Sequence, residues 1–190
     1  MLKRFSLILA ALILALGILT TSVVRTTALT TTKPAVKNLT PTPAVVQVAK
    51  PVDYFLAYPG VLPDHMLYPL KMIRDRIWVW LTVDPLKKGQ LLLLLADKRL
   101  GAGKALIEGG KVDLGITTLT KGEKYLEQAI AQALLAKANG RADALLKTLG
   151  QATLKHEEVL LVIREKVDDS QKAVIDQILN YSRHGQEQLR

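Results

Sequence analysis

The sequence predicts an all-α protein: an antiparallel bundle of about five helices behind an N-terminal signal or anchor helix and a disordered stalk. From residue 54 onward, aliphatic side chains recur at helical intervals, and no segment alternates convincingly as a strand does. Gly and Pro residues interrupt this pattern where helices should end. Hydrophobic residues make up 49% of the 190 residues but aromatic ones only 5%. One folded domain with a mostly aliphatic core is therefore expected.

Residues 1–28 are predicted to be a signal peptide or a signal-anchor helix. The basic start MLKR precedes an uncharged run from Phe5 to Val24, which as a helix would span about 30 Å, the thickness of a bilayer core. The best cleavage site, after Ala28, matches the small-residue rule poorly. A cleaved peptide and an uncleaved anchor therefore both fit, and in the second case the membrane is a partner through Phe5–Val24.

Residues 29–53 are rich in Thr, Pro, Val and Lys and lack helical periodicity, which is typical of a flexible stalk. Lys3 and Arg4 favour a cytoplasmic N-terminus and hence an exported domain, although Arg25 lies just beyond the other end of the apolar run. We expect a domain located in the bacterial cell envelope, either membrane-anchored or secreted. The opposite orientation would give a cytoplasm-facing regulatory domain.

The first helix of the domain is predicted over Leu67–Leu81. Its large apolar residues recur at helical spacing on one face, and Trp80 is expected to point inward with them. These residues are Leu70, Ile73, Ile77, Trp80 and Leu81.

The second helix is predicted to begin at Asp84-Pro85, an N-cap followed by Pro at the first helical position, and to end at Gly109-Gly110. It contains Leu91–Leu95, a run that covers more than one turn and is apolar on all sides. Only eight uncharged residues separate Lys88 from Asp97, too few for the roughly 20 that cross a bilayer. We expect this turn to be core, with an exposed patch as the alternative.

Three more helices complete the predicted bundle. They are expected over residues 113–139, which end before Gly140, over residues 142–167, and from a cap at Asp168-Asp169-Ser170 nearly to the C-terminus.

Charge and composition argue against several functions. The net charge is +9, but six of the 26 Lys and Arg residues precede residue 51 while all 17 acidic residues follow it. The rest of the chain carries only +3, with interleaved signs, which does not suit a nucleic-acid partner. The chain has no cysteine, so disulfides and thiolate sites are excluded.

Several phrases resemble a bacterial family of exported helical proteins that carry a domain of unknown function. The resemblance runs from about Tyr58 to the C-terminus and implies an all-helical domain behind a signal or anchor segment, without an activity. This chain differs from the family in the apolar run Leu91–Leu95 and in Gly101 and Gly103. The matching residues are Leu62-Pro63-Asp64, Leu67 to Lys71, Leu81-Thr82, Asp84-Pro85, Lys87-Lys88, Ala96, Arg99-Leu100, Ala152, Lys155-His156, Val159-Leu160 and Ser182 to Glu187.

His156 is the most unusual polar residue because it falls on the apolar stripe of the helix over 142–167. If the last two helices form a hairpin, it lies near Tyr181 and Ser182. We expect a buried structural cluster of these three residues, in which His156→Leu would change stability by about 1 kcal/mol. The alternative is a ligand or metal contact assisted by Glu157 or His184.

No metal, cofactor or catalytic motif is recognisable. The chain contains no H-E-x-x-H, no Glu-x-x-His pair, no nucleophile elbow and no phosphate-binding loop. Consecutive residues such as His156 and Glu157 point in different directions around a helix and cannot converge on one ion. We expect no cofactor, no metal site, no catalytic residue and no enzymatic activity.

Trp78 is the candidate partner contact. It shares a helix face with Lys71 and Arg74, where an exposed tryptophan favours contact with a protein or a membrane interface. Alternatively, Tyr54, Phe55 and Tyr58 fold back to cover it.

The sequence as a whole indicates a non-enzymatic, envelope-located interaction module, with a protein as a possible partner. A small-molecule or metal-binding bundle with a cavity near His156 and Tyr181 is the alternative.

Overall fold

A computed structural model describes residues 52–138 and 140–190, so the predicted segment Phe5–Val24 and nearly all of the stalk lie outside the described residues. The described part contains helices in the predicted order and no β-strand, which confirms the all-α prediction. None of the described helices is long and apolar enough to cross a membrane. The helices are α2 (Tyr68–Leu81), α3 (Pro85–Glu108), α4 (Val112–Lys137), α5 (Asp143–Arg164) and α6 (Asp169–Gln188).

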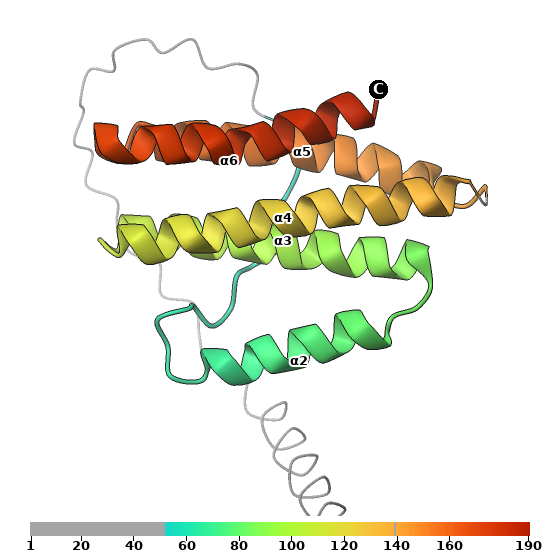
Figure 1. Ribbon diagram of the computed structural model, residues 1–190, viewed down its shortest axis with the longest axis horizontal. Helices are drawn as coiled ribbons and strands as arrows, with labels where there is room; N and C mark the ends of the chain where they lie inside the picture. The colour runs from blue at the N-terminus through green and yellow to red at the C-terminus, as the bar shows by residue number, and fades with distance from the viewer. Residues whose placement is uncertain (1–51, 139) are drawn as a thin grey trace, which may run out of the picture. The chain divides into compact units, whose positions relative to one another are not determined.

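Two antiparallel hairpins make the body of the domain. Figure 1 shows α3 and α4 side by side in the middle, with the α5–α6 hairpin on one side and α2 on the other. The core lies between the two hairpins and divides into two apolar clusters. Aliphatic side chains dominate both clusters, in agreement with the composition.

The predicted boundaries of α3 are confirmed. Asp84 is the N-cap, and its Oδ1 accepts hydrogen bonds from the backbone N–H groups of Leu86 at 2.9 Å and Lys87 at 3.2 Å. Pro85 occupies the first helical position, where its missing N–H costs no hydrogen bond. At the other end the chain leaves the helix through Gly110, whose φ of 78° suits a glycine. Asp168 lies at the N-cap of α6 as predicted, but its side chain makes no capping bond.

The leucine run is mostly core. Leu92, Leu93 and Leu95 are buried, whereas Leu94 is 39% exposed. The uniformly apolar turn is packed on most of its sides because α4 and α5 both contact this part of α3.

The close contact between α3 and α4 depends on small residues. A Cβ added to Gly103 would lie 2.6 Å from the buried Leu119 side chain and 3.0 Å from the carbonyl oxygen of Gly115. Gly103 therefore permits the close packing of α3 against α4. Gly101 faces the other way, where the nearest atom to an added Cβ is Pro59 Cδ at an ordinary 3.5 Å.

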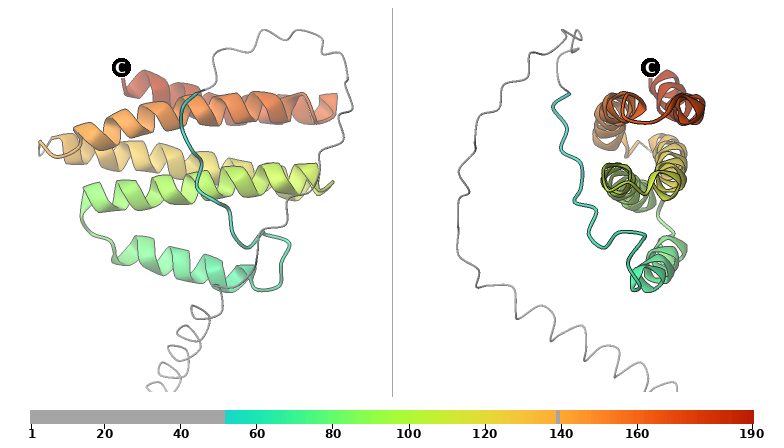
Figure 2. Two further views of the ribbon diagram at one scale, coloured as in Figure 1. Left: turned by 180° about the vertical axis from the view of Figure 1, so that it is seen from behind. Right: turned by 90° about the vertical axis from the view of Figure 1, so that its left-hand side faces the viewer.

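Residues 52–66 form a strap, extended at first and turning over residues 61–66, that crosses the outside of α5 and α3 before α2 begins (Figure 2). The backbone N–H of Val52 donates to the Glu158 carboxylate of α5 at 3.0 Å. Further along, the Lys71 ammonium of α2 donates to the carbonyl oxygens of Pro59 at 2.7 Å and Val61 at 3.0 Å. The strap thus contacts α5, α3 and α2.

The orientation of α2 differs from the prediction. Its apolar residues do share one face, but that face points to solvent, and Trp80 is 78% exposed rather than inward. The side of α2 toward α3 instead carries Tyr68, Met72 and the buried Asp75. Periodicity identified the face correctly but could not identify what covers it. The α2 apolar face consists of Leu70, Ile73, Ile77, Trp80 and Leu81, all exposed.

Alanine substitutions at the two neighbouring glycines should have opposite effects. Gly103→Ala should lower the free energy of unfolding by about 1–3 kcal/mol, because the new methyl group overlaps Leu119 and the Gly115 backbone. Gly101→Ala should be neutral or stabilising by up to about 1 kcal/mol, since alanine favours the helix and fits the available space. Urea denaturation of residues 47–190 measures both. Equal effects would contradict this account of the contact.

Candidate functional site

The most concentrated group of ionisable side chains surrounds His156. This residue is fully buried on α5. Its Nδ1 lies 2.6 Å from Oε1 of Glu123 on α4, and its Nε2 lies 3.1 Å from Oδ1 of Asp97 on α3. One imidazole ring therefore joins three helices through two carboxylates, both of which are also buried.

Three further donors satisfy the outer oxygens of these carboxylates. The Ser182 hydroxyl of α6 donates to Oε2 of Glu123. On the strap, the Tyr54 hydroxyl donates to Oδ2 of Asp97 at 2.9 Å, and a backbone N–H donates to the same oxygen. We call His156, Glu123, Asp97, Ser182 and Tyr54 the buried charge cluster; it links α3, α4, α5, α6 and the strap.

The two carboxylates keep His156 protonated. Burial alone lowers the pKa of this residue, but the charge of Glu123 and the hydrogen bonds to Asp97 and Glu123 outweigh burial and raise the pKa to about 9. At neutral pH both ring nitrogens therefore carry hydrogens and donate. Burial also raises the pKa of Tyr54, and the adjacent charge of Asp97 adds to the effect, so its hydroxyl remains a donor.

The sequence predicted only part of this cluster. His156 and Ser182 do belong together and are buried, but Glu123 connects them rather than a direct contact. Tyr181 is outside the cluster. Glu157, the expected assistant of His156 in a ligand or metal site, instead accepts a hydrogen bond from Arg183 at the surface at 2.8 Å. Glu157 and His156 therefore do not act together.

The two acids were missed although the sequence contains a signal for them. Glu123 lies between Leu119 and Leu126 on the buried stripe of α4, and Asp97 lies between Leu93 and Leu100 on that of α3. An acid on an apolar stripe needs a partner, because an unpaired buried charge is very unfavourable. Because His156 also lies on an apolar stripe, the sequence could have predicted that it pairs with these two acids.

The buried charge cluster does not have the geometry of a metal site. Each ring nitrogen of His156 points at a different carboxylate on an opposite side of the ring. Among residues 52–138 and 140–190, no group of three or more His, Asp or Glu residues is arranged to hold a metal ion. With His156 and Glu123 fully buried, a substrate could not reach the ring without unfolding of the cluster. The arrangement is suited to holding helices together.

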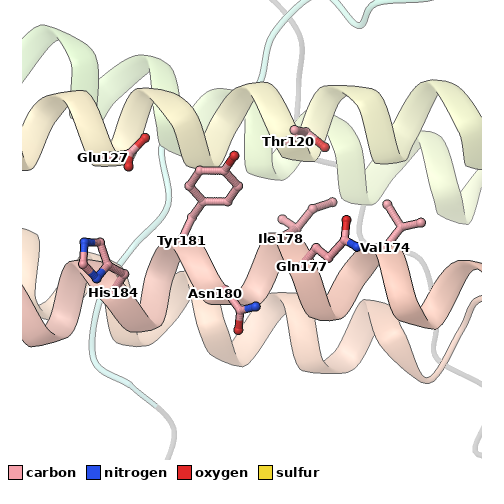
Figure 3. Close-up of a pocket in the computed structure, with 8 residues that line it drawn as sticks. All are labelled: Thr120, Glu127, Val174, Gln177, Ile178, Asn180, Tyr181 and His184. Carbon is pink, nitrogen blue, oxygen red and sulfur yellow. The ribbon is translucent and has the colours of Figure 1, made fainter.

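A separate open pocket of about 460 Å³ lies between α4 and α6. Figure 3 shows Tyr181 projecting from α6 toward α4, with Glu127 and Thr120 on the opposite side and His184 one turn along α6. The predicted cavity near Tyr181 therefore exists, but His156 does not line it. That separation removes the main argument for a ligand site built on His156.

Trp78 is accessible to a partner. It is 55% exposed, and the aromatic residues that might have covered it do not: Phe55 and Tyr58 are themselves exposed, and Tyr54 turns inward to Asp97. Trp78 lies beside the α2 apolar face and extends the apolar surface that α2 presents to solvent.

Replacement of His156 should be far more harmful than the sequence suggested. His156→Leu would leave Glu123 and Asp97 buried without their shared cation, so the free energy of unfolding of residues 47–190 should fall by about 3–5 kcal/mol in urea denaturation. The exposed His184 provides a matched control, and His184→Leu should change it by less than about 0.5 kcal/mol. A loss of only about 1 kcal/mol for His156→Leu would contradict the charged arrangement.

Stability should depend on pH through His156. Its pKa is raised in the folded state, so its contribution is complete below about 6.5, the value in an unfolded chain, and disappears as pH rises through about 9. The urea midpoint should fall between pH 6.5 and 9. His156→Gln should abolish that fall and His184→Gln should retain it. Parallel profiles for the wild type and His156→Gln would show that the histidine is not charged.

Comparison with known proteins gives a family but no activity. Residues 60–170, more than half of the chain, match the family described as "Domain of unknown function (DUF5667)". The match begins in the strap and ends in the first turn of α6. No curated protein and no solved structure matches the chain. The chain therefore belongs to the DUF5667 family, in agreement with the resemblance to a domain of unknown function.

Proposed function

We propose that this protein is a non-enzymatic, membrane-tethered interaction module of the cell envelope, and that its α2 apolar face lies in the surface layer of a lipid bilayer. The observation that carries this proposal is the exposure of that face, which lines one side of a whole helix at the edge of the domain.

The α2 apolar face is too continuous to be incidental. Single exposed hydrophobic residues are normal on soluble proteins, whereas contiguous apolar patches mark interaction sites. Here five large side chains share one face, and Met66, Leu67 and Val83 extend it at the two ends of α2. Each such side chain gains about 1.5–3 kcal/mol when fully removed from water. A surface that covers this face would therefore be bound with considerable free energy.

The residues around the face favour lipid as the covering surface. Arg74 and Arg76 are exposed on α2 at the two sides of the apolar stripe. Arg74 is paired with the buried Asp75 at 2.7 Å, whereas the aliphatic stem of Arg76 can lie along the stripe while its charge reaches phosphate groups. Trp78 and Trp80 are of the type that collects at membrane interfaces. An apolar face with tryptophan and flanking arginines is the pattern of helices that lie in the plane of a membrane surface.

The predicted N-terminal anchor supplies the second part of such attachment. If Phe5–Val24 remains in the membrane, the stalk keeps α2 close to the bilayer, so that docking becomes an intramolecular event. Even a weak surface affinity then suffices. A single weak signal gives only reversible attachment, and two together make it stable.

We propose that the protein is not an enzyme because its most reactive side chains are buried. Within the described residues, the side chains with the strongest acid–base coupling are those of the buried charge cluster, where His156 and Glu123 are not reached by solvent. Their hydrogen bonds are mutual and leave no open position for a substrate.

Tryptophan fluorescence tests the proposal directly in the full chain. Both tryptophans of the chain are on α2, so the predicted anchor adds no signal. In reconstituted vesicles, brominated phospholipids should quench the emission strongly. Ile77→Glu, which places a charge in the apolar face, should abolish quenching, whereas the matched change Leu135→Glu at an exposed site of α4 should not.

Two results would contradict the proposal. One is emission that brominated lipids do not affect. The other is pairing of the α2 apolar faces of two copies of the chain. The chain has no cysteine, so an Ile77→Cys variant carries a single thiol. If the faces pair, this variant would form disulfide dimers, and brominated lipids would not quench its tryptophans.

A further inference from the structure

We infer that a basic groove beside α2 binds the phosphate headgroup of an anionic phospholipid, an inference that rests on the proposed docking of α2 on a bilayer. The groove lies between α2, α3 and α4 and has a volume of about 540 Å³. None of the described residues that line it is acidic. Its cations come from all three helices and are Arg76, Lys88, Arg99, Lys121 and Lys124.

Arg99 is a buried cation that lines this groove. The residue is only 5% exposed, yet within the described part of the chain no carboxylate forms an ion pair with its guanidinium. Its Nη1 donates to the Tyr68 hydroxyl at 3.0 Å, its Nη2 contacts the Met72 thioether at 2.9 Å, and its Nε is buried without a partner. Burial of a charge normally requires a paired opposite charge. A ligand anion in the groove would supply it.

Acidic side chains in the neighbourhood are engaged elsewhere. Asp75 is buried on the α2 side but is bonded to Arg74 at 2.7 Å. Glu123 is on α4 close to the groove lysines in sequence, but it points into the core toward His156. Asp75 also lines a small cavity with Arg99, but neither acid forms an ion pair with a cation of the groove.

Cations face the groove from two opposite walls. The exposed Lys121 and Lys124 on α4 form one wall, and Tyr125 and Arg99 also line the groove, with the Arg99 guanidinium 4.8 Å from the centre of the Tyr125 ring. The other wall is α2, where Arg76 and Trp80 line the groove. Guanidinium and ammonium groups together are well suited to phosphate oxygens.

Trp80 connects the groove to the α2 apolar face, because it lines the first and belongs to the second. A ligand that carries a phosphate next to acyl chains could place the phosphate among the cations and the chains along α2. A free phosphate would use only the cations. This continuity between charged groove and apolar face is the reason for assigning a lipid as the ligand.

The test uses the full chain with Trp78→Phe, so that Trp80 alone reports from the groove, reconstituted in phosphatidylcholine vesicles with rising phosphatidylglycerol content. The emission of Trp80 should change and saturate as phosphatidylglycerol increases. Lys121→Gln with Lys124→Gln should raise the half-saturating lipid fraction about 30-fold, since each lysine near an anionic surface contributes about a factor of five to ten. Inorganic phosphate added over pure phosphatidylcholine should have little effect.

A charge-matched control separates the groove from general attraction. Lys137→Gln with Lys147→Gln removes the same charge from exposed positions at the end of α4 and on α5, and should shift half-saturation by less than about threefold. Equal shifts in the two double variants would overturn the groove site, as would a response of equal size to inorganic phosphate. With either of these results, brominated phosphatidylcholine could still quench the tryptophan emission. Failure of the groove site is therefore distinguishable from failure of the bilayer docking.

Discussion

The fold of this domain depends on one buried ion: the imidazolium of His156, held between Glu123 and Asp97. Contacts between aliphatic side chains are not directional, so apolar packing alone would specify the register of the α3–α4 and α5–α6 hairpins only weakly. The buried charge cluster does not allow this. Each carboxylate must meet its ring nitrogen and its own hydroxyl donor, and a displacement by one turn would leave a buried charge unpaired. The cluster therefore fixes the register of the two hairpins.

The same cluster also fixes the strap. Tyr54 reaches from the strap to Asp97, and burial with the adjacent negative charge raises the pKa of its hydroxyl, so that it remains a donor. The strap is the first described segment of the chain, and it is attached to the buried charge cluster. By contrast, α2, which follows the strap, packs mainly against α3 and keeps its outer face free.

The sequence predicted the elements well and the environment of α2 poorly. Helical periodicity, Asp84 with Pro85 and the Gly109-Gly110 stop are local signals, and they gave the helices to within a few residues. The direction of the α2 apolar face is not local. Periodicity shows that Ile73 and Ile77 share a face, but not whether protein, lipid or water covers it. The pattern within one helix also could not identify the partners of His156, since Glu123 lies on another helix, 33 residues away in the chain.

The two buried cations of the domain make the most informative contrast. His156 is surrounded by carboxylates and hydroxyl donors, and every polar atom of its cluster has a partner. Arg99, also on a core-facing position and also nearly inaccessible, has a tyrosine hydroxyl, a thioether and an aromatic ring instead, and its Nε has none. One buried cation is thus fully paired with carboxylates of the chain, and the other is not. That Arg99 instead opens toward four more cations and an uncovered apolar helix is what one expects if its counter-ion belongs to the membrane surface.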